Sequence, residues 1–397
     1  MTSNYNKLGP FIRQIDVRNI NGIEENLLGV STQKVFIKSI ANTVGTNFNR
    51  YKVVKQKQFV YVPDTSRRGD KIGLAMLEHL DEGIVSQAYT VFEVVDHNKL
   101  DPNYLMMWFR RPEFDRYARF KSHGSVREIF GWDEMCDVEL PIPDISEQKR
   151  IVKEYKTITD RIKLNKQLNS KLEESALTIY KQWFIDFEFP MSLEYAESIG
   201  KPELTGQPYR SSGGQFIDTF DGKEMPVFWT ATVFADIATV ASGKSAKNMS
   251  VVWSEDTPYP VLGAGASVGF CMDYLYSDKL LVMGRVGTHG VIRRINDKCW
   301  PSDNTLVIQS DYYEYTYQLL KSINYDELNR GGVQALITQT DIKNVKIILP
   351  DIHTLIEFER LASNIFFHSA NSKKMSKTLS SLGSTLQEKM SKSDFAL

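Results

Sequence analysis

The sequence predicts an α+β protein in which two mixed α/β units are separated by two long helices that form a coiled coil. Two observations carry this prediction. A segment near the middle of the 397-residue chain recurs near its end, and each copy leads into about 40 residues with a heptad of apolar side chains. Hydrophobic residues make up 42% of the chain, which is enough to bury sizeable cores and excludes wholesale disorder.

The internal repeat keeps a constant offset of 207 positions without a gap. Its register runs for about 60 positions, from a glycine turn through an apolar strand and into a helix. Chance is a poor explanation of such a register, so the repeat indicates two copies of one structural unit. The matched residues include Gly124 and Gly331, Val126 and Val333, Val138 and Val345, Pro143 and Pro350, Asp144 and Asp351, Ile158 and Ile365, and Leu172 and Leu379.

In each copy a helix start follows a strand-like run that ends in proline. Asp144, with Glu147 three residues on, predicts a capping box. In the second copy Asp351 takes the cap position and Thr354 replaces the glutamate, which weakens the box. About 40 residues without proline follow each cap, and a helix of that length spans about 60 Å. Such a helix is hard to place inside one compact domain, so we expect a rod.

Both long segments carry the a/d seam of a coiled coil, apolar at its ends and polar at its centre. The polar centre of the second segment consists of Ser369, Ser372 and Ser376. The predicted interface residues are Ile151, Tyr155, Ile158, Ile162, Leu172, Ala176, Ile179 and Trp183 in the first helix, and Phe358, Ala362, Ile365, Leu379, Leu386 and Met390 in the second.

Two features of the seam stay open at this level. Asn165 and Asn169 occupy its central positions in the first helix, but a stutter would instead turn Leu164 and Leu168 inward. The direction of pairing is also open, because the two polar centres meet in a parallel pair as well as in an antiparallel one.

The predicted domain boundaries follow from these segments. Residues 1–143 and 226–350 form the two units, 144–187 and 351–397 the two helices, and 188–225 an extended linker rich in glycine and proline. Within the units, apolar runs at 59–62, 84–86, 90–95, 280–283 and 305–308 predict strands, and residues 102–121 and 312–329 predict helices.

No catalytic or metal-binding set is predicted. Gly243-Lys244-Ser245 ends like a phosphate-binding loop, but Ala238 stands where the first glycine is needed. The six histidines lack metal-ligand spacing, and no serine lies in a nucleophile-elbow context. We therefore expect a protein that is not an enzyme in its own right.

Composition bears on location and charge. The three cysteines are far apart, and the amino terminus lacks the apolar region of a secretory signal, so we expect the reducing cytoplasm. No stretch approaches the roughly 20 apolar residues of a membrane span. The net charge of −1 does not by itself indicate nucleic acid, although basic residues outnumber acidic ones in the first unit.

Binding chemistry is concentrated in short loops of the first unit. Arg67, Arg68 and Lys71 form a compact basic turn, and arginine forks read guanine edges and phosphates. A second basic stretch, from Arg110 to Lys121, is somewhat better explained by solvated helix and loop charges.

In the second unit the segment from Met283 to Gly290 follows a strand and carries Arg285, Thr288 and His289 among three glycines. Glycines let backbone amides approach a ligand closely, and the three polar side chains suit base edges or phosphates. A purely structural glycine-rich hairpin is the alternative. Further candidate contacts are Lys244 and the residues flanking the repeated glycine turns, which are His123 and Arg127 in one copy and Arg330 and Gln334 in the other.

In these features the chain resembles, over nearly its whole length, the specificity subunit of type I restriction–modification systems. Leu140 to Pro143 followed by Glu147 to Val152 is similar to the family's central region, and Trp183 to Phe187 to its usual exit. Gly83 to Tyr89 and Gly284 to Thr288 resemble a common type of recognition unit, which adds Gln87 and Tyr89 to the candidate DNA contacts. The second helix departs from the pattern at His353 and Thr354.

The resemblance implies two target-recognition domains, each reading one half of a bipartite site in double-stranded DNA. It also implies that the helices pair antiparallel as a spacer and dock two methyltransferase subunits, which in turn recruit restriction and translocase subunits. S-adenosylmethionine, magnesium and ATP are then expected on those partners, and no cofactor or metal on this chain.

Two other classes remain as alternatives. The same kind of subunit serves fused nuclease–methyltransferase (type II) systems, and only the partner's sequence distinguishes that case. A coiled-coil scaffold that binds proteins alone is the other, and it predicts no salt-dependent affinity for DNA.

Overall fold

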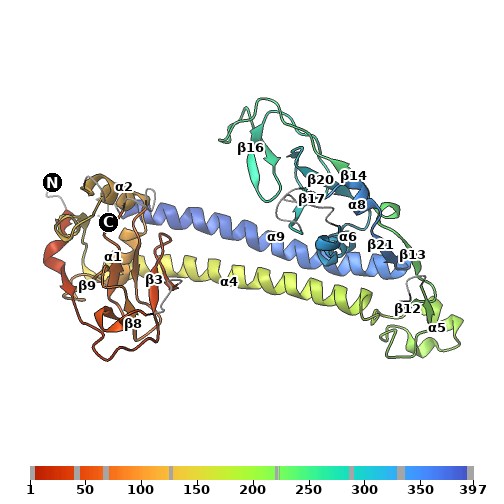
Figure 1. Ribbon diagram of the computed structural model, residues 1–397, viewed down its shortest axis with the longest axis horizontal. Helices are drawn as coiled ribbons and strands as arrows, with labels where there is room; N and C mark the ends of the chain where they lie inside the picture. The colour runs from red at the N-terminus through yellow and green to blue at the C-terminus, as the bar shows by residue number, and fades with distance from the viewer. Residues whose placement is uncertain are drawn as a thin grey trace. The chain divides into compact units, whose positions relative to one another are not determined.

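The computed structural model describes residues 5–39, 45–65, 71–124, 128–219, 222, 224–285, 290–328 and 336–390 (Figure 1). It divides into two compact units, Met1–Asn165 with Lys374–Leu397, and Lys166–Lys373. This division differs from the expected boundaries because each long helix contributes a part to each unit. There its side chains join the unit's hydrophobic core.

The first unit has a four-stranded antiparallel sheet in the order β2-β9-β6-β7. Its core joins Phe59 and Phe92 of this sheet, stacked with ring centroids 4.9 Å apart, to Phe109 of a covering helix. The elements are β1 (Tyr5–Lys7), β2 (Ile12–Ile15), β3 (Leu28–Val30), β4 (Phe36–Lys38), β5 (Lys52–Lys55), β6 (Phe59–Tyr61), β7 (Leu74–Met76), β8 (Glu82–Val85), β9 (Thr90–Val94), α1 (Pro102–Phe109), α2 (Pro112–Lys121), α3 (Trp132–Cys136) and β10 (Glu139–Pro141).

The second unit repeats this plan with a sheet in the order β14-β20-β17-β18. A smaller sheet, β16-β15-β19, projects beside it. The elements are α5 (Leu193–Ser198), β11 (Phe216–Asp218), β12 (Glu224–Pro226), β13 (Thr230–Val233), β14 (Thr239–Ser242), β15 (Tyr259–Leu262), β16 (Ser267–Cys271), β17 (Leu280–Gly284), β18 (Ile292–Ile295), β19 (Trp300–Pro301), β20 (Thr305–Gln309), α6 (Tyr313–Ser322), α7 (Tyr325–Leu328), α8 (Gln339–Lys343) and β21 (Lys346–Leu349).

The offset read from the sequence holds for the elements themselves. Helix α3 and helix α8 lie 207 positions apart at both ends, and so do the first residues of the two long helices, α4 (Ile145–Phe184) and α9 (Ile352–Lys389). Each copy also closes with the same strand pairing, β1 with β10 and β13 with β21. The internal repeat is therefore a structural one.

Each long helix begins at the predicted aspartate. Asp144 Oδ1 accepts hydrogen bonds from the backbone amides of Ser146 and Glu147, and Asp351 Oδ1 does the same for His353 and Thr354. The Glu147 side chain pairs with Arg150. The Thr354 hydroxyl donates to Asp351 at 2.6 Å, so the second helix start is as well capped as the first.

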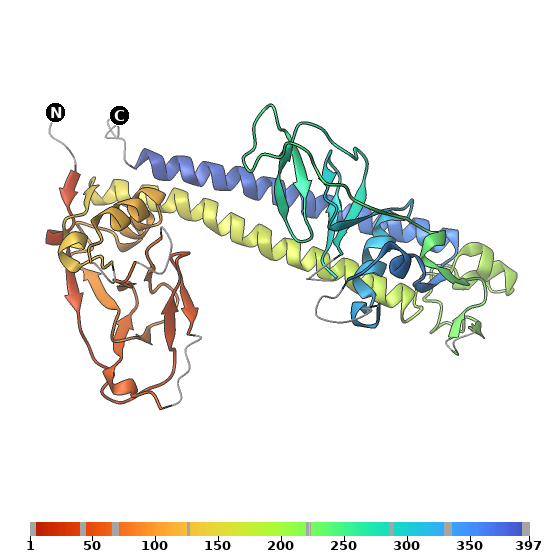
Figure 2. The ribbon, with the colours of Figure 1, turned by 45° about the horizontal axis from the view of Figure 1, so that its top comes forward.

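The two helices pair antiparallel (Figure 2). In the first unit, Gln387 Nε2 donates to the Tyr155 hydroxyl at 3.2 Å, near the start of α4 and the end of α9. In the second unit the ends are exchanged, since Trp183 lies against Phe358 with ring centroids 6.0 Å apart. Every predicted interface residue is buried or partly buried.

The centre of the seam is polar. Asn165 and Asn169 are 3% and 9% exposed, whereas Leu164 and Leu168 are 54% and 47% exposed. The stutter that would turn the leucines inward does not occur. Ser369 and Ser372 of α9 are also buried, so polar side chains occupy the seam from both helices.

The described residues between 188 and 225 fold rather than extend as a linker. They contain α5 and the β11–β12 hairpin, and Phe189 and Tyr209 stack within the core of the second unit at a centroid distance of 4.7 Å. The glycines and prolines that suggested a linker serve tight turns between these pieces, and the aromatic residues supply the burial that holds them.

Candidate nucleic-acid interface

In the first unit, two of the predicted contact segments lie at one edge of the four-stranded sheet. Strands β6 and β9 are antiparallel, with Tyr61 opposite Thr90, so the end of β6 lies beside the start of β9. The loop toward Lys71 leaves β6 at this edge, and the turn with Gln87 and Tyr89 enters β9 there. Lys71 and Gln87 are exposed, while Tyr89 packs against a buried cluster and is half-buried.

The third segment, the turn after α2, meets the same edge. The Thr65 amide donates to the Glu128 carbonyl at 3.0 Å, and the Thr65 hydroxyl donates to Ser122 at 2.9 Å. His123 pairs with Ile129 across the turn and is exposed. The structure thus brings the start of the basic loop and the predicted glycine turn together.

The second unit assembles three segments in the same way. Arg285 directly follows β17, and its amide donates to the Asn304 carbonyl at 3.0 Å, in the turn that enters β20. The Ile337 amide donates to the Arg285 carbonyl at 3.0 Å, which brings in the turn before α8. These two hydrogen bonds join the three segments at one edge of the sheet.

The two edges are equivalent under the repeat. Phe130 and Ile337 lie 207 positions apart, and each donates its amide to a carbonyl just beyond the central strand, of Pro63 at 2.9 Å and of Arg285 at 3.0 Å. The chain that follows β6 and the chain that follows β17 therefore leave their sheets at equivalent places. The sequence predicted DNA contacts in both loops, but it did not relate the two loops to each other.

Several predicted contacts lie outside the described residues. They are Arg67, Arg68, Arg127, Thr288, His289, Arg330 and Gln334.

Two cationic residues that the sequence predicted as DNA contacts are described at the second edge. They are Arg285 and Lys244. The Arg285 side chain is half-buried, and its Nε has no hydrogen-bond partner in the part of the chain that the structure describes. Lys244 is exposed, and its backbone is held by the Pro301 carbonyl at 2.9 Å and the Trp300 indole at 2.7 Å.

The second basic stretch is mostly committed to ion pairs. Arg110 pairs with Glu78 at 3.0 Å and Arg116 with Glu113 at 3.0 Å, and Arg119 pairs with Glu128. Arg111 is buried and stacks on Trp108 at 4.3 Å from the ring centroid. These contacts agree with the interpretation of the stretch as structural charge.

Sequence reasoning missed two features of these edges. Ser302, Asp303 and Asn304 form the turn equivalent to that of Gln87, and their position ahead of a buried strand was the available signal. Phe120 at the end of α2 is 80% exposed, next to Arg119 and Lys121, which gives the first edge an apolar side chain among basic ones.

Within the described part of the chain, no three histidine, cysteine, aspartate or glutamate side chains come together in a way that could hold a metal ion. None of the described helices is long and apolar enough to cross a membrane. Burial raises the pKa of Cys299 to about 11, which leaves that thiol a poor nucleophile near neutral pH.

The fold and the paired edges define a class of protein with two homologous α/β units and two antiparallel helices. The family model described as "Type I restriction modification DNA specificity domain" matches residues 15–174 and 226–392, and the chain belongs to this family.

Relatives agree with this assignment. The chain is 25% identical over 314 residues to the type I restriction enzyme MjaIX specificity subunit of Methanocaldococcus jannaschii, an alignment that covers 72% of this chain and 67% of the relative. It is 27% identical over 168 residues to the type I restriction enzyme HindI specificity subunit of Haemophilus influenzae, covering 39% and 36%. The fold is similar to the crystal structure of the type I restriction–modification S subunit from M. genitalium, with a TM-score of 0.59, 12% identity and coverage of 98% and 96%.

Proposed function

We propose that this chain is the sequence-specific DNA-binding subunit of a type I restriction–modification complex, and that it has no catalytic activity of its own. Each unit reads one half of a bipartite target in double-stranded DNA. The observation that carries the proposal is the recurrence of three loop segments at the same edge of both four-stranded sheets, joined by equivalent hydrogen bonds of Phe130 and Ile337. Two equivalent edges on one chain suit two half-sites.

The chemistry of these edges supports contact with DNA. Lys71 and His123 are exposed at the first edge, and Lys244 and Arg285 lie at the second. Cationic side chains neutralise phosphates, and arginine forks and amides read base edges in the major groove.

The antiparallel helices are proposed to set the distance between the half-sites and to dock two methyltransferase subunits. Those partners would carry S-adenosylmethionine, and the restriction and translocase subunits would carry magnesium and ATP. Leu164 and Leu168 are exposed on α4 and available to such partners. A complex of this kind acts on DNA in the cytoplasm.

Methylation profiling of host DNA with and without the gene tests the proposal. We expect a set of bipartite sites that are modified only when the gene is present. An unchanged set of modified sites, with the methyltransferase subunit expressed, would contradict the proposal. Salt-insensitive binding, or no DNA binding by the assembled complex, would favour a protein scaffold.

A further inference from the structure

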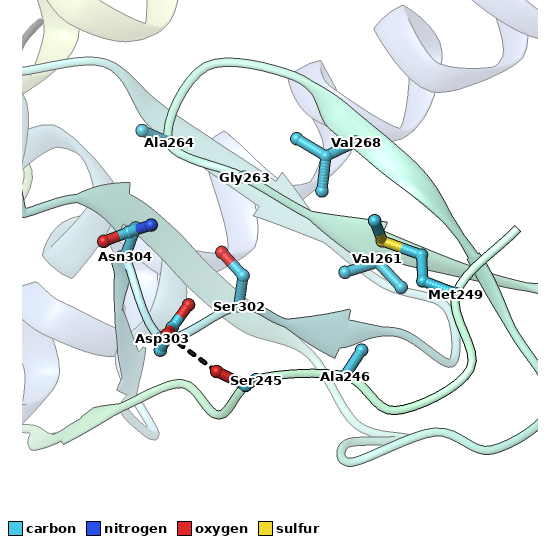
Figure 3. A pocket seen from close by; sticks show the side chains of 10 residues that line it. All are labelled: Ser245, Ala246, Met249, Val261, Gly263, Ala264, Val268, Ser302, Asp303 and Asn304. Carbon is cyan, nitrogen blue, oxygen red and sulfur yellow. Dashed lines mark hydrogen bonds between the residues drawn. The ribbon is translucent and has the colours of Figure 1, made fainter. Parts of the chain in front are cut away.

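A cavity of about 670 Å³ lies at the second edge, beside Asn304 (Figure 3). Three segments of the second unit line it. They are the chain after β14 from Ser245 to Met249, the β15–β16 hairpin around Gly263, and the turn from Ser302 to Asn304. Since the Arg285 amide donates a hydrogen bond to the Asn304 carbonyl, the cavity opens next to the predicted DNA contacts.

Backbone contacts hold the three segments together. The Ser302 amide donates to the Leu262 carbonyl at 2.9 Å, and the Lys244 amide donates to the Pro301 carbonyl at 2.9 Å. Gly243 permits this approach, because a Cβ at that position would lie 2.2 Å from the Ser302 carbonyl oxygen. The cavity is therefore built from fixed backbone on its polar side.

The cavity has an apolar wall and a polar rim. Met249, Val261 and Val268 form the wall together with two alanines. On the rim, the Ser245 hydroxyl donates to Asp303 Oδ2 at 2.7 Å, which orients the carboxylate (Figure 3). Its other oxygen accepts no hydrogen bond from the residues that the structure describes. Asp303 and Asn304 are both exposed.

This rim selects against a phosphate and for a base. A carboxylate repels phosphate oxygens, so an aspartate at a DNA-binding edge is costly unless it accepts a hydrogen bond. In the major groove the donors are the exocyclic amino groups, N4 of cytosine and N6 of adenine. An asparagine amide can donate and accept, and it suits the N6 and N7 edge of adenine.

We propose that Asp303, oriented by Ser245, and its neighbour Asn304 read the exocyclic amino group of one cytosine or adenine in the half-site of the second unit. The apolar wall accepts the edge of the same base step. This inference rests on the proposed function and adds to it the residues that determine one base of the second half-site. The equivalent turn in the first unit carries Gln87, whose amide has matching chemistry.

Genome-wide mapping of methylated sites tests the inference. The chain is co-expressed with its methyltransferase subunit as wild type or as Asp303→Asn, Ser245→Ala or Asn304→Ala. Asp297→Asn is the matched control, because Asp297 is an exposed aspartate of the same unit outside the cavity.

We expect the first half-site to stay unchanged in all variants. Asp303→Asn should relax or change one position of the second half-site, a position that is cytosine or adenine in the wild-type motif, by roughly tenfold or more in relative methylation. Ser245→Ala should relax the same position less, and Asp297→Asn should leave the motif intact. The identity of the relaxed base distinguishes cytosine from adenine.

Three outcomes would overturn the inference. One is a wild-type motif in both Asp303→Asn and Asn304→Ala, and another is a relaxed position in the first half-site. The third is loss of the methyltransferase subunit from the complex without a change of motif, which would make the cavity a protein contact. If Asp303→Asn fails to fold, Ser245→Ala and Asn304→Ala decide the matter. A wild-type chain that directs no bipartite methylation would instead refute the proposed function.

Discussion

Asn165 of α4 donates a hydrogen bond from its side-chain Nδ2 to the hydroxyl of Ser376 of α9, at 3.2 Å. Both residues belong to the polar centre of the seam, where a packed coiled coil would ordinarily place leucine or isoleucine. Some polar seam residues can hydrogen-bond to each other in only one alignment of the two helices. Such residues specify the register of the pair, at a cost in stability. We therefore expect the Asn165–Ser376 hydrogen bond to favour this register of the two helices.

The serines of this seam are not equivalent. Ser376 accepts the bond from Asn165, whereas the buried hydroxyl of Ser369 has no hydrogen-bond partner within the described residues. Ser369→Ala should therefore raise the free energy of unfolding by about 1 kcal/mol, because it removes an unsatisfied buried polar group. Urea denaturation followed by circular dichroism measures the change.

Ser376→Ala is the matched control and should lower the free energy of unfolding by about 1 kcal/mol, since it leaves the Asn165 amide without this acceptor. Equal effects of the two substitutions, in either direction, would show that the hydrogen bond does not distinguish the two serines.

Gly243 and Gly265 offer a second matched pair, each within two residues of a residue that lines the cavity of the second unit. A Cβ on Gly243 would meet the Ser302 carbonyl at 2.2 Å, while a Cβ on Gly265 would meet nothing within 4 Å. Gly243→Ala must displace backbone and should cost about 1–3 kcal/mol of stability. Gly265→Ala should be nearly neutral. Thermal unfolding of both variants checks this, and a neutral Gly243→Ala would mean that the turn yields freely.

Much of the fold was readable because the repeat and the heptad are long-range periodic signals. The offset that links Val138 to Val345 located the helices, and Asp144 and Asp351 located their starts. The strands β6, β9, β17 and β20 lie where the apolar runs predicted them. These signals depend on burial patterns, which the spacing of apolar residues along the sequence records directly.

Other features were beyond the sequence because they depend on tertiary contacts. Leu168 or Asn169 could each have faced the partner helix, and only the packing of α9 against α4 places the asparagine inside. Residues 188–225 looked like a linker because the burial of Tyr209 and Phe189 is made with distant residues such as Trp229. Asp303 carries no motif, and only strand pairing brings it to the edge with Arg285.

A buried carboxylate predicts that the stability of the second unit depends on pH. The Glu359 carboxylate of α9 accepts hydrogen bonds from the backbone amides of Glu314 and Tyr315, at 3.1 and 2.7 Å, at the start of α6. Burial raises the pKa of Glu359 to about 7, while those two amides and the nearby Arg294 act in the opposite direction and Glu314 adds to the rise. In the unfolded chain this pKa returns to about 4.3.

The folded state thus holds more protons than the unfolded state between about pH 4.3 and pH 7. The free energy of unfolding should fall as pH rises through this window, by at most about 4 kcal/mol. Glu359→Gln should flatten that dependence, and the exposed Glu255→Gln should not. Urea denaturation at a series of pH values from 5 to 8 measures the free energy of unfolding. If it changes with pH equally in wild type and in Glu359→Gln, Glu359 is not the source of the pH dependence.

The last prediction concerns the independence of the two edges. Arg285 lies at the second edge, where its backbone joins the turn of Asn304 to the turn before α8, while its side chain has an unpartnered Nε within the described residues. Arg285→Ala should weaken recognition of the second half-site by about 1–3 kcal/mol, or about 5- to 150-fold, and leave the first half-site intact. Gln87→Ala should do the reverse. Binding of the assembled complex to duplexes altered in one half-site at a time separates the two effects, and an equal loss at both halves with either variant would mean that the units do not read DNA independently.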